Sequence, residues 1–350
     1  MKQIILPIAI LVCSFHLGTC QDMHFSQFDM SPLTLNPSLT GVFNGDQRAS
    51  LHYKDQWTGF GSGYKTYSFS GDAKLMNKKW DHTTLGLGLN IFKDMAGDAQ
   101  LSDTKALLSI SGIVDISNEQ QVSAGIQGGI VQNRLDPSSA MWDDQYVNGA
   151  YNAGVSTQEQ INHEALFYAD ASMGISWSYT ENQSTISSYD ATRVVVGMAI
   201  HHLNKPDYSY SLSGSELPLY SKFIFHANSN IGIKNTRFTI KPGAMAAFQG
   251  PSKEILAGAL LRYRLREASR FTGLLKEQAI SLGGHYRFND AFVPSLWYEA
   301  GNLALCISYD VNVSALKEAS NMRGGMEVAL RFINPSPFRY SKKSFTPMLK

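Results

Sequence analysis

The stretch FYADASMGISWSY, from Phe167 to Tyr179, is the part of the sequence that decides the fold. One set of alternate positions carries Phe167, Ala169, Ala171, Met173, Ile175, Trp177 and Tyr179, and the other carries Tyr168, Asp170, Ser172, Gly174, Ser176 and Ser178. A repeat of two residues is the period of a β-strand. Strands of soluble proteins usually run about 5 to 6 residues. The stretch therefore predicts an unusually long strand with two chemically different faces.

The same alternation recurs along the chain, and no segment shows a convincing helical period. The predicted strands begin near Gln47, Tyr64, Thr83, Ser102, Gln120, Leu166, Ala191, Lys222, Asn235, Lys253, Glu277, Ala291, Asn302 and Met322. A tilted strand of about 9 to 11 residues crosses a bilayer, and an even number of strands closes without leaving an edge. We therefore expect an all-β protein, with residues 47–333 forming a transmembrane outer-membrane β-barrel of about 14 antiparallel strands.

The lengths of the connections support this prediction. The long segments 134–165 and 204–221 both follow strands that run in one direction, whereas short links such as Lys234-Asn235 and Gly301-Asn302 lie at the opposite ends of the strands. Long outer loops and short periplasmic turns are typical of outer-membrane barrels. Segment 266–276 disagrees, because it is long on the side where short turns are expected.

A secreted, soluble β-sandwich is the alternative, since its strands also alternate. The polar faces of the predicted strands carry small residues and scattered charges, which suit a wet or plugged barrel interior better than the core of a sandwich. These charges are Asp170, Arg262, Arg264, Glu327 and Arg331. A net charge of +1 over 350 residues gives no electrostatic indication of nucleic-acid binding.

Residues 1–20 have the pattern of a secretory signal peptide. A basic residue precedes an apolar run from Ile4 to Leu17, and small residues follow. We expect export to the cell outer membrane with cleavage before Gln21. Lipidation of Cys20 is the alternative. After Cys20 only Cys306 remains, so an intramolecular disulfide in the exported chain is excluded.

The segment 21–46, which precedes the first predicted strand, contains the stretch FSQFDMSPLTLNPSLTG from Phe25 to Gly41. It is rich in apolar side chains, but two prolines exclude a continuous helix or a central strand. At membrane depth, such irregular backbone is tolerated only where it is buried in protein or lines a water-filled cavity. The sequence therefore predicts a plug or mouth-sealing segment; a flexible tail is the alternative.

Three separated clusters, QDMHFSQF, SPLTLNPSLTG and KDQWTGF, follow one another in order. Together they resemble motifs of the PorP/SprF family of outer-membrane proteins from the type IX secretion and gliding machinery of Bacteroidetes. The matching residues are Gln21, Asp22, Phe25, Ser26, Gln27, Pro32, Leu33, Leu35, Asn36, Pro37, Gly41, Gln56, Trp57, Gly59 and Phe60. The stretches YRFND, ISYDVNVSAL and RGGMEVALRF resemble the late strands of the family, so the resemblance extends over nearly the whole chain.

The sequence also departs from the family pattern. Ser31, Ser38 and the pair Lys54-Asp55 replace the usual residues, and a basic C-terminal tail, 334–350, continues past the strand where family members often stop. The resemblance implies a component or partner of type IX secretion that supports export and surface anchoring of a secreted adhesin through the C-terminal domain of that adhesin. Membrane lipid and other secretion components are the further partners implied. The alternative is a passive channel or hydrophobic-solute transporter.

Two groups of residues, each with aromatic side chains, are candidates for partner binding, because both fall on the predicted outer side. Trp57, Gly59 and Phe60 form one group, and Trp142, Tyr146 and Tyr151 form the other. Aromatic side chains are frequent anchors of protein interfaces. A packed aromatic turn and solvated barrel loops are the alternative interpretations of the two groups.

We expect no enzymatic activity, metal site or cofactor. His201 and His202 are adjacent in a predicted strand, so they should point to opposite faces and cannot chelate one ion together. His163-Glu164 has no further ligand at metal-binding spacing. No nucleophile elbow or phosphate-binding glycine loop occurs in the sequence.

Overall fold

The computed structural model describes most of the chain between residues 23 and 334. The described ranges are 23–57, 63–75, 82–97, 100–136, 141–147, 149–152, 154–156, 165–181, 192–208, 218–267, 276–314 and 316–334. The predicted signal peptide therefore lies outside the described residues, as does the predicted C-terminal tail after Asn334.

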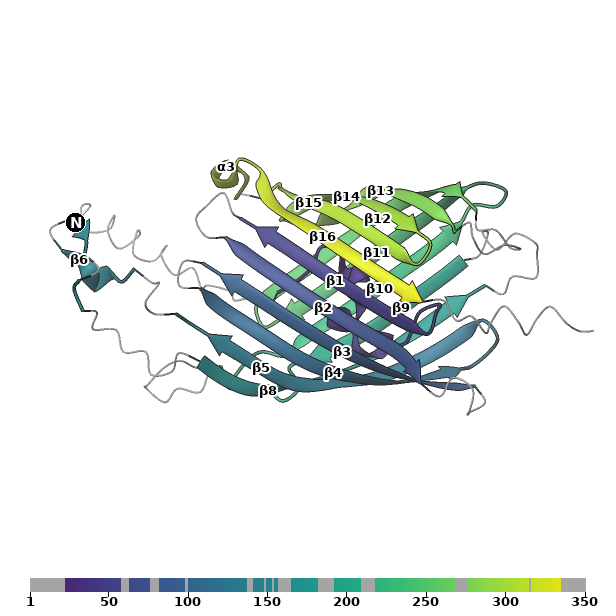
Figure 1. The fold of residues 1–350 in the computed structure, drawn as a ribbon, viewed down its shortest axis with the longest axis horizontal. Helices are drawn as coiled ribbons and strands as arrows, with labels where there is room; N and C mark the ends of the chain where they lie inside the picture. The colour runs from purple at the N-terminus through teal and green to yellow at the C-terminus, as the bar shows by residue number, and fades with distance from the viewer. Residues whose placement is uncertain are drawn as a thin grey trace, which may run out of the picture.

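Fourteen long strands form one closed, entirely antiparallel barrel in the order β1-β16-β15-β14-β13-β12-β11-β10-β9-β8-β5-β4-β3-β2 (Figure 1). The strands are β1 Gln47–Gln56, β2 Tyr64–Leu75, β3 Thr83–Ala96, β4 Leu101–Asp115, β5 Gln120–Arg134, β8 Ala165–Thr180, β9 Thr192–His201, β10 Lys222–Gly232, β11 Phe238–Gln249, β12 Ser252–Arg266, β13 Gln278–Arg287, β14 Ala291–Ala300, β15 Leu303–Asn312 and β16 Arg323–Asn334. Closure joins the first strand to the last, from Gln47 opposite Asn334 to Gln56 opposite Gly325.

The two faces of each strand divide between the outside and the inside of the barrel. On β15 the side chains of Leu303, Leu305, Ile307 and Tyr309 are exposed, whereas those of Ala304, Cys306, Ser308 and Asp310 are buried. Apolar side chains thus point outward and small or polar ones inward, as expected of a barrel surrounded by hydrocarbon. The soluble β-sandwich considered from the sequence is wrong, because a single closed sheet has its apolar face outside.

The predicted strand starts agree closely with the structure. The largest difference is at β11, predicted from Asn235 and observed from Phe238. A tight turn occupies the missing residues: the Ile233 amide donates to the Phe238 carbonyl oxygen, and Asn235 has a φ of 59°. Asparagine tolerates this left-handed backbone conformation better than most residues, so it marks the turn and not the strand.

The two ends of the barrel differ. We call the end where β1, β5, β9 and β15 finish the loop end, and the opposite end, where β1 begins, the turn end. The segments 134–165 and 204–221 both start at the loop end, as predicted. The short elements there are η4 Asp143–Gln145, β6 Tyr146–Val147, β7 Ala150–Tyr151 and α3 Leu316–Ser320. None of the helices in the described residues is long and apolar enough to cross a membrane.

Candidate functional site

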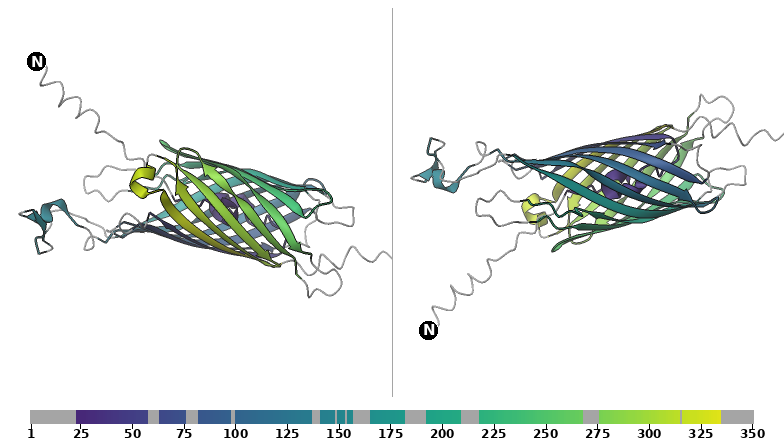
Figure 2. Two further views of the ribbon diagram at one scale, coloured as in Figure 1. Left: turned by 90° about the horizontal axis from the view of Figure 1, so that it is seen from above. Right: turned by 90° about the horizontal axis from the view of Figure 1, so that it is seen from below.

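The N-terminal segment, residues 23–46, lies inside the barrel, where Figures 1 and 2 show it in purple. It contains three short turns, η1 Phe28–Met30, α2 Pro32–Leu35 and η2 Pro37–Leu39. Proline opens both α2 and η2, where its fixed φ favours the first helical position and no donor is lost. The prolines that exclude a long helix therefore produce a compact series of turns.

Apolar side chains of this segment pack against the inner wall in two clusters. Phe28, Leu35, Leu39 and Val42 join wall residues that include Ile113, Ile224, Met245 and Leu256. Met30 packs with Leu260, Trp297, Ala304, Cys306 and Ala329. Full burial of a large apolar side chain contributes about 1.5 to 3 kcal/mol. Cys306 is a fully buried, free cysteine in this cluster.

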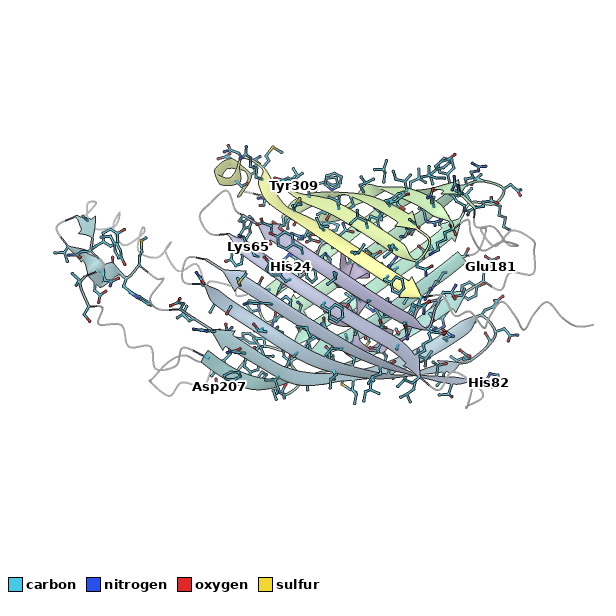
Figure 3. The ribbon with its side chains drawn as sticks, in the orientation of Figure 1. His24, Lys65, His82, Glu181, Asp207 and Tyr309 are labelled. Carbon is cyan, nitrogen blue, oxygen red and sulfur yellow. The ribbon has the colours of Figure 1, made fainter. Side chains whose placement is uncertain are left out.

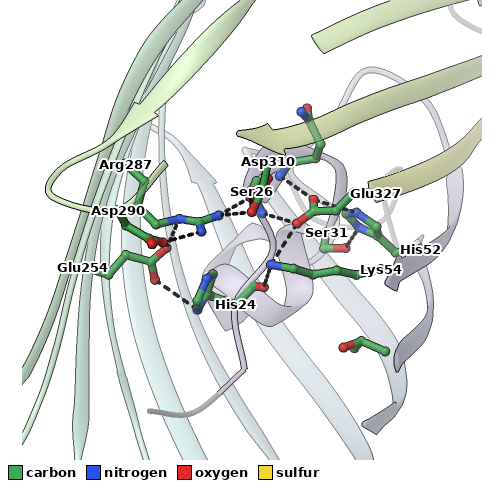
Figure 4. A network of polar contacts seen from close by, with 12 residues as sticks. His24, Ser26, Ser31, His52, Lys54, Glu254, Arg287, Asp290, Asp310 and Glu327 are labelled. Atoms are coloured by element: carbon green, nitrogen blue, oxygen red, sulfur yellow. Dashed lines mark hydrogen bonds and ion pairs between the residues drawn. The ribbon is translucent and has the colours of Figure 1, made fainter. Parts of the chain in front are cut away.

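Two buried carboxylates hold the segment near the loop end (Figure 4). Glu327 on β16 accepts hydrogen bonds from the amides of Ser26, at 2.9 Å, and Gln27, at 3.1 Å. Asp310 on β15 accepts one from the Ser26 hydroxyl at 2.9 Å. Both carboxylates are 1% exposed. Hydrogen bonds to a charged acceptor are stronger than neutral ones, so these contacts fix the position of the FSQ motif.

Positive side chains from the wall compensate these carboxylates. The Lys54 ammonium lies 3.0 Å from Glu327, and the Arg287 guanidinium lies 2.9 Å from Asp310. His52 stacks on the Phe25 ring at 3.9 Å between centroids, and its Nδ1 is 2.9 Å from the Ser31 hydroxyl. A buried charge is tolerated when it is paired and hydrogen-bonded. The paired charges of this network therefore hold residues 25–31 in position.

The first described residues lie close to the loop end. Figure 3 places His24 in the part of the barrel toward Lys65 and Asp207, away from Glu181 and His82. Lys54 donates to the His24 carbonyl oxygen at 3.1 Å, and Lys222 to that of Met23 at 3.3 Å. The segment thus begins near the loop end and reaches the turn end at Gln47, so it passes through the barrel.

His24 itself carries a partly buried imidazole near several cations. Burial, followed by the charges of Lys54, Arg287 and Lys222, holds its pKa well below the usual range. The imidazole is therefore neutral at neutral pH. Its contact with Glu254, at 3.6 Å, is then not an ion pair.

Asn36 fixes the middle of the segment. Its amide nitrogen donates to the carbonyl oxygens of Ile175 and Met198, both at 3.1 Å, and lies 3.0 Å from His226 Nε2. Its side-chain oxygen caps η2 by accepting from the Ser38 amide at 2.9 Å. Each hydrogen-bonding group of this fully buried side chain is used, so few other residues could replace it.

Inward-facing glycines make room for the backbone of the segment. A Cβ atom at Gly125 would lie 2.5 Å from the Pro37 carbonyl oxygen, and one at Gly197 would lie 2.8 Å from the Asn36 amide nitrogen. A Cβ at Gly86 would lie 2.5 Å from the Thr40 carbonyl oxygen. These glycines come from β5, β9 and β3, so the wall and the segment are matched in shape.

Toward the turn end, cations bind carbonyl oxygens of the segment. Arg48 forms an ion pair with Asp72 at 2.8 Å and donates to the Leu39 carbonyl oxygen at 3.0 Å. Asp72 also accepts from the Gly41 amide at 2.7 Å. Gly41 has a φ of 76°, a conformation that favours glycine, which accounts for its place in the motif.

The aromatic candidates for partner binding are not brought into one site. Trp57 packs edge-on against Tyr64, 5.3 Å between ring centroids, at the loop end. Gly59 and Phe60 lie outside the described residues. Tyr146 and Tyr151 face each other across the β6–β7 pair, with ring centroids 5.8 Å apart, and Trp142 is the N-cap of η4. Figure 1 shows β6 beyond the loop end, apart from β1.

One expectation about the histidine pair is wrong. His201 and His202 are both buried: His201 Nδ1 is 3.0 Å from the Ser172 hydroxyl, and His202 Nδ1 is 3.0 Å from Asp170. The strand ends at His201 and His202 has a φ of 56°, so the alternation of a strand no longer applies. Within the described ranges no cluster of His, Cys, Asp or Glu could hold a metal ion. His163-Glu164 lies outside these ranges.

The sequence did not indicate which wall residues bind the segment. Glu327 had been noted as a charge on an inner face, but Asp310, Arg287 and Asn36 had no assigned contacts. One signal in the sequence could have identified such residues: a carboxylate at a strand position that alternates with apolar residues and is flanked by small ones. In a barrel whose interior is occupied, such a position is buried.

A closed antiparallel barrel with an apolar exterior is the architecture of outer-membrane β-barrel proteins. The family described as "Type IX secretion system membrane protein PorP/SprF" matches residues 18–332, and the chain belongs to this family. It is therefore a membrane protein associated with type IX secretion. No curated protein matches this sequence.

Several solved barrels are similar at low sequence identity. The CymD monoaromatic hydrocarbon channel has 10% identity and a TM-score of 0.44, over 90% of this chain and 95% of its own. BamA from Haemophilus ducreyi lacking POTRA domains 1–3 has 10% identity and a TM-score of 0.42, over 82% and 70%. CdiB from Acinetobacter baumannii has 9% identity and a TM-score of 0.40; 82% of this chain matches 60% of that chain.

Proposed function

We propose that the protein is an outer-membrane partner of type IX secretion that supports the surface anchoring of a secreted adhesin. In this proposal the adhesin does not cross the membrane through the interior of this barrel. The observation that carries this proposal is the N-terminal segment inside the barrel, bound by Glu327 toward one end and by Arg48 toward the other. A secreted polypeptide could use the interior only after these contacts were broken. The segment serves as a plug, and the adhesin is held at the loop end.

The loop end faces the cell exterior in this proposal, because long loops of outer-membrane barrels are extracellular. The Tyr146 and Tyr151 pair offers aromatic area there for the C-terminal domain of the adhesin. Trp57 is a weaker candidate, since its ring already packs on Tyr64. Export by the signal peptide, 1–20, belongs to the same proposal.

Deletion of residues 22–42 in the native bacterium tests the proposal against the channel alternative. The proposal predicts loss of adhesin from the cell surface and its retention in the periplasm, with little change in permeability to small antibiotics. The double variant Tyr146→Ala, Tyr151→Ala is the matched comparison, because it leaves the segment and its wall intact. It should reduce surface adhesin without altering the barrel's unfolding midpoint.

The opposite pattern would support a passive channel. In that case the deletion raises permeability or abolishes uptake of a hydrophobic solute, whereas surface adhesin stays at the wild-type level in both variants.

A further inference from the structure

Strand β8 extends farther toward the loop end than its neighbour β9. It pairs with β5 along almost its whole length, as far as Ala165 opposite Arg134, whereas its pairing with β9 stops at Met173 opposite Ile200. Figure 1 shows β5 and β8 side by side at the loop end. Within the described residues, segment 165–172 therefore has no strand beside it on the β9 side. This half of β8 is a sheet edge, which presents backbone groups for further pairing.

The chain that follows β9 covers only part of this edge. The Leu203 amide donates to the Ala171 carbonyl oxygen at 2.9 Å. The Asn204 side chain accepts from the Ala171 amide at 3.2 Å and donates to the Ala169 carbonyl oxygen at 2.6 Å. One asparagine side chain thus makes the hydrogen bonds that the backbone of a further strand would make. These contacts end at Ala169.

The alternation of the ladder fixes the direction of the remaining backbone groups. In an antiparallel pair, successive residues direct their N–H and C=O groups alternately toward and away from one neighbour. Ala171 directs both groups away from β5, whereas the Thr180 amide donates to the Glu119 carbonyl oxygen on the β5 side. Phe167 belongs to the same set of alternate positions as Ala171. Its amide and carbonyl groups therefore face the side where no described strand lies.

The open part of the edge lies beyond the apolar band of the barrel. Gln132 of β5 is opposite Phe167 and is followed by Arg134 at the next outward position; both alternate with the buried Asn133. Outward positions within hydrocarbon are apolar, so these two polar residues mark the limit of the band. Unpaired backbone groups are not tolerated in hydrocarbon, which agrees with this location. The Phe167 side chain is 63% exposed. The described residues thus leave the edge open to a partner outside the hydrocarbon.

We propose that residues 165–169 accept an extended strand from the C-terminal domain of the secreted adhesin, which then continues the barrel sheet at the loop end. This mode of binding rests on the function proposed above. A strand is the fitting partner, because another extended backbone satisfies a row of backbone donors and acceptors. β8 also follows directly on segment 134–165, which carries the Tyr146 and Tyr151 pair, so the edge is continuous with the surface proposed for the same partner.

Proline at position 167 tests the edge in the native bacterium. Phe167→Pro removes the amide on the open side and spares the ladder with β5, whereas Phe167→Ala removes the same side chain and keeps the amide. Client proteins are defined as those that trypsin releases from intact wild-type cells, by mass spectrometry, but not from cells that lack the whole chain. Phe167→Pro should lower their surface level about tenfold relative to Phe167→Ala.

Two contrary outcomes of this experiment differ in what they overturn. Clients at equal levels in Phe167→Pro and Phe167→Ala cells would overturn the strand pairing and leave the proposed function in place. The absence of any client would contradict the proposed function and this partner together.

Hydrogen exchange on the purified wild-type protein tests for other occupants of the edge. In detergent, residue-resolved exchange should be fast at the Phe167 amide and slow at the Leu166 and Tyr168 amides, which point toward β5. A protected Phe167 amide in a monomer would show that the chain covers its own edge. Protection only in a dimer would assign the edge to a second copy. Either result overturns the proposal, and the measurement needs no variant that might fail to fold.

Discussion

The two halves of the N-terminal segment are held in different ways. Residues 23–31 are bound by side chains, since Glu327 and Asp310 accept hydrogen bonds from Ser26 and its neighbour. Residues 36–46 are bound through shape and through carbonyl oxygens, with Gly125 against Pro37. The first half therefore depends mainly on charge, which a single substitution can remove. The second half is also contacted by Arg48 and Asp72, but it depends in addition on the absence of side-chain volume in the wall.

The largest effect is expected from Glu327→Gln, which tests the charge-dependent half. The substitution removes the ion pair with Lys54 and leaves that buried ammonium uncompensated. We expect a loss of about 3 to 5 kcal/mol in unfolding free energy, measured by urea denaturation in detergent. Glu318→Gln on α3 is the control, because Glu318 is exposed. Equal midpoints for the two variants would show that the carboxylate does not fasten the segment.

A smaller effect is expected from Gly125→Ala, which tests the shape-dependent half. The added Cβ would lie 2.5 Å from the Pro37 carbonyl oxygen, so the segment must shift, at a cost of about 1 to 3 kcal/mol. Gly128→Ala on the same strand is the matched control, because its Cβ would meet nothing closer than 3.7 Å. Limited proteolysis should cut the segment faster in the first variant only. Similar cleavage rates for the Gly125→Ala and Gly128→Ala variants would show that the fit between the segment and the wall at Gly125 does not hold the segment in place.

The smallest effect is expected from acidification. Because the pKa of His24 is held below its usual value of about 6.5, its stabilising contribution is present above that pH and decreases as the pH falls toward the folded-state pKa. The difference in urea midpoint between wild type and His24→Gln should therefore change between pH 7.5 and pH 5. His82→Gln, at an exposed position, should show no such pH-dependent difference. A constant difference for His24→Gln would exclude this linkage.

The sequence predicted the barrel well because strand periodicity is local. Each strand needs only its own alternation to assign its faces, and thirteen neighbouring positions sufficed at Phe167 to Tyr179. Failures occurred where the backbone leaves the strand conformation. His202 turns inward because its φ is positive, and β11 starts late because Asn235 belongs to a turn.

The site was less predictable because its contacts connect distant parts of the chain. Ser26 and Glu327 are 301 positions apart, and no local pattern pairs them. Asn36 could be singled out only by resemblance to a family motif; its partners in β8, β9 and β10 became visible once the barrel had placed them together. Glu327, in contrast, alternates along β16 with residues that face outward. The sequence therefore did indicate that its carboxylate points into the barrel.

Closure of the sheet between β1 and β16 has a consequence for biogenesis. Glu327, which accepts a hydrogen bond from the Ser26 amide, belongs to β16, the last strand of the barrel in chain order. A barrel that lacks this strand also lacks the carboxylate that binds the amides of Ser26 and Gln27, so we expect its N-terminal segment to be held less firmly. Resistance of residues 23–31 to proteolysis is therefore expected to appear only after β16 has joined the barrel.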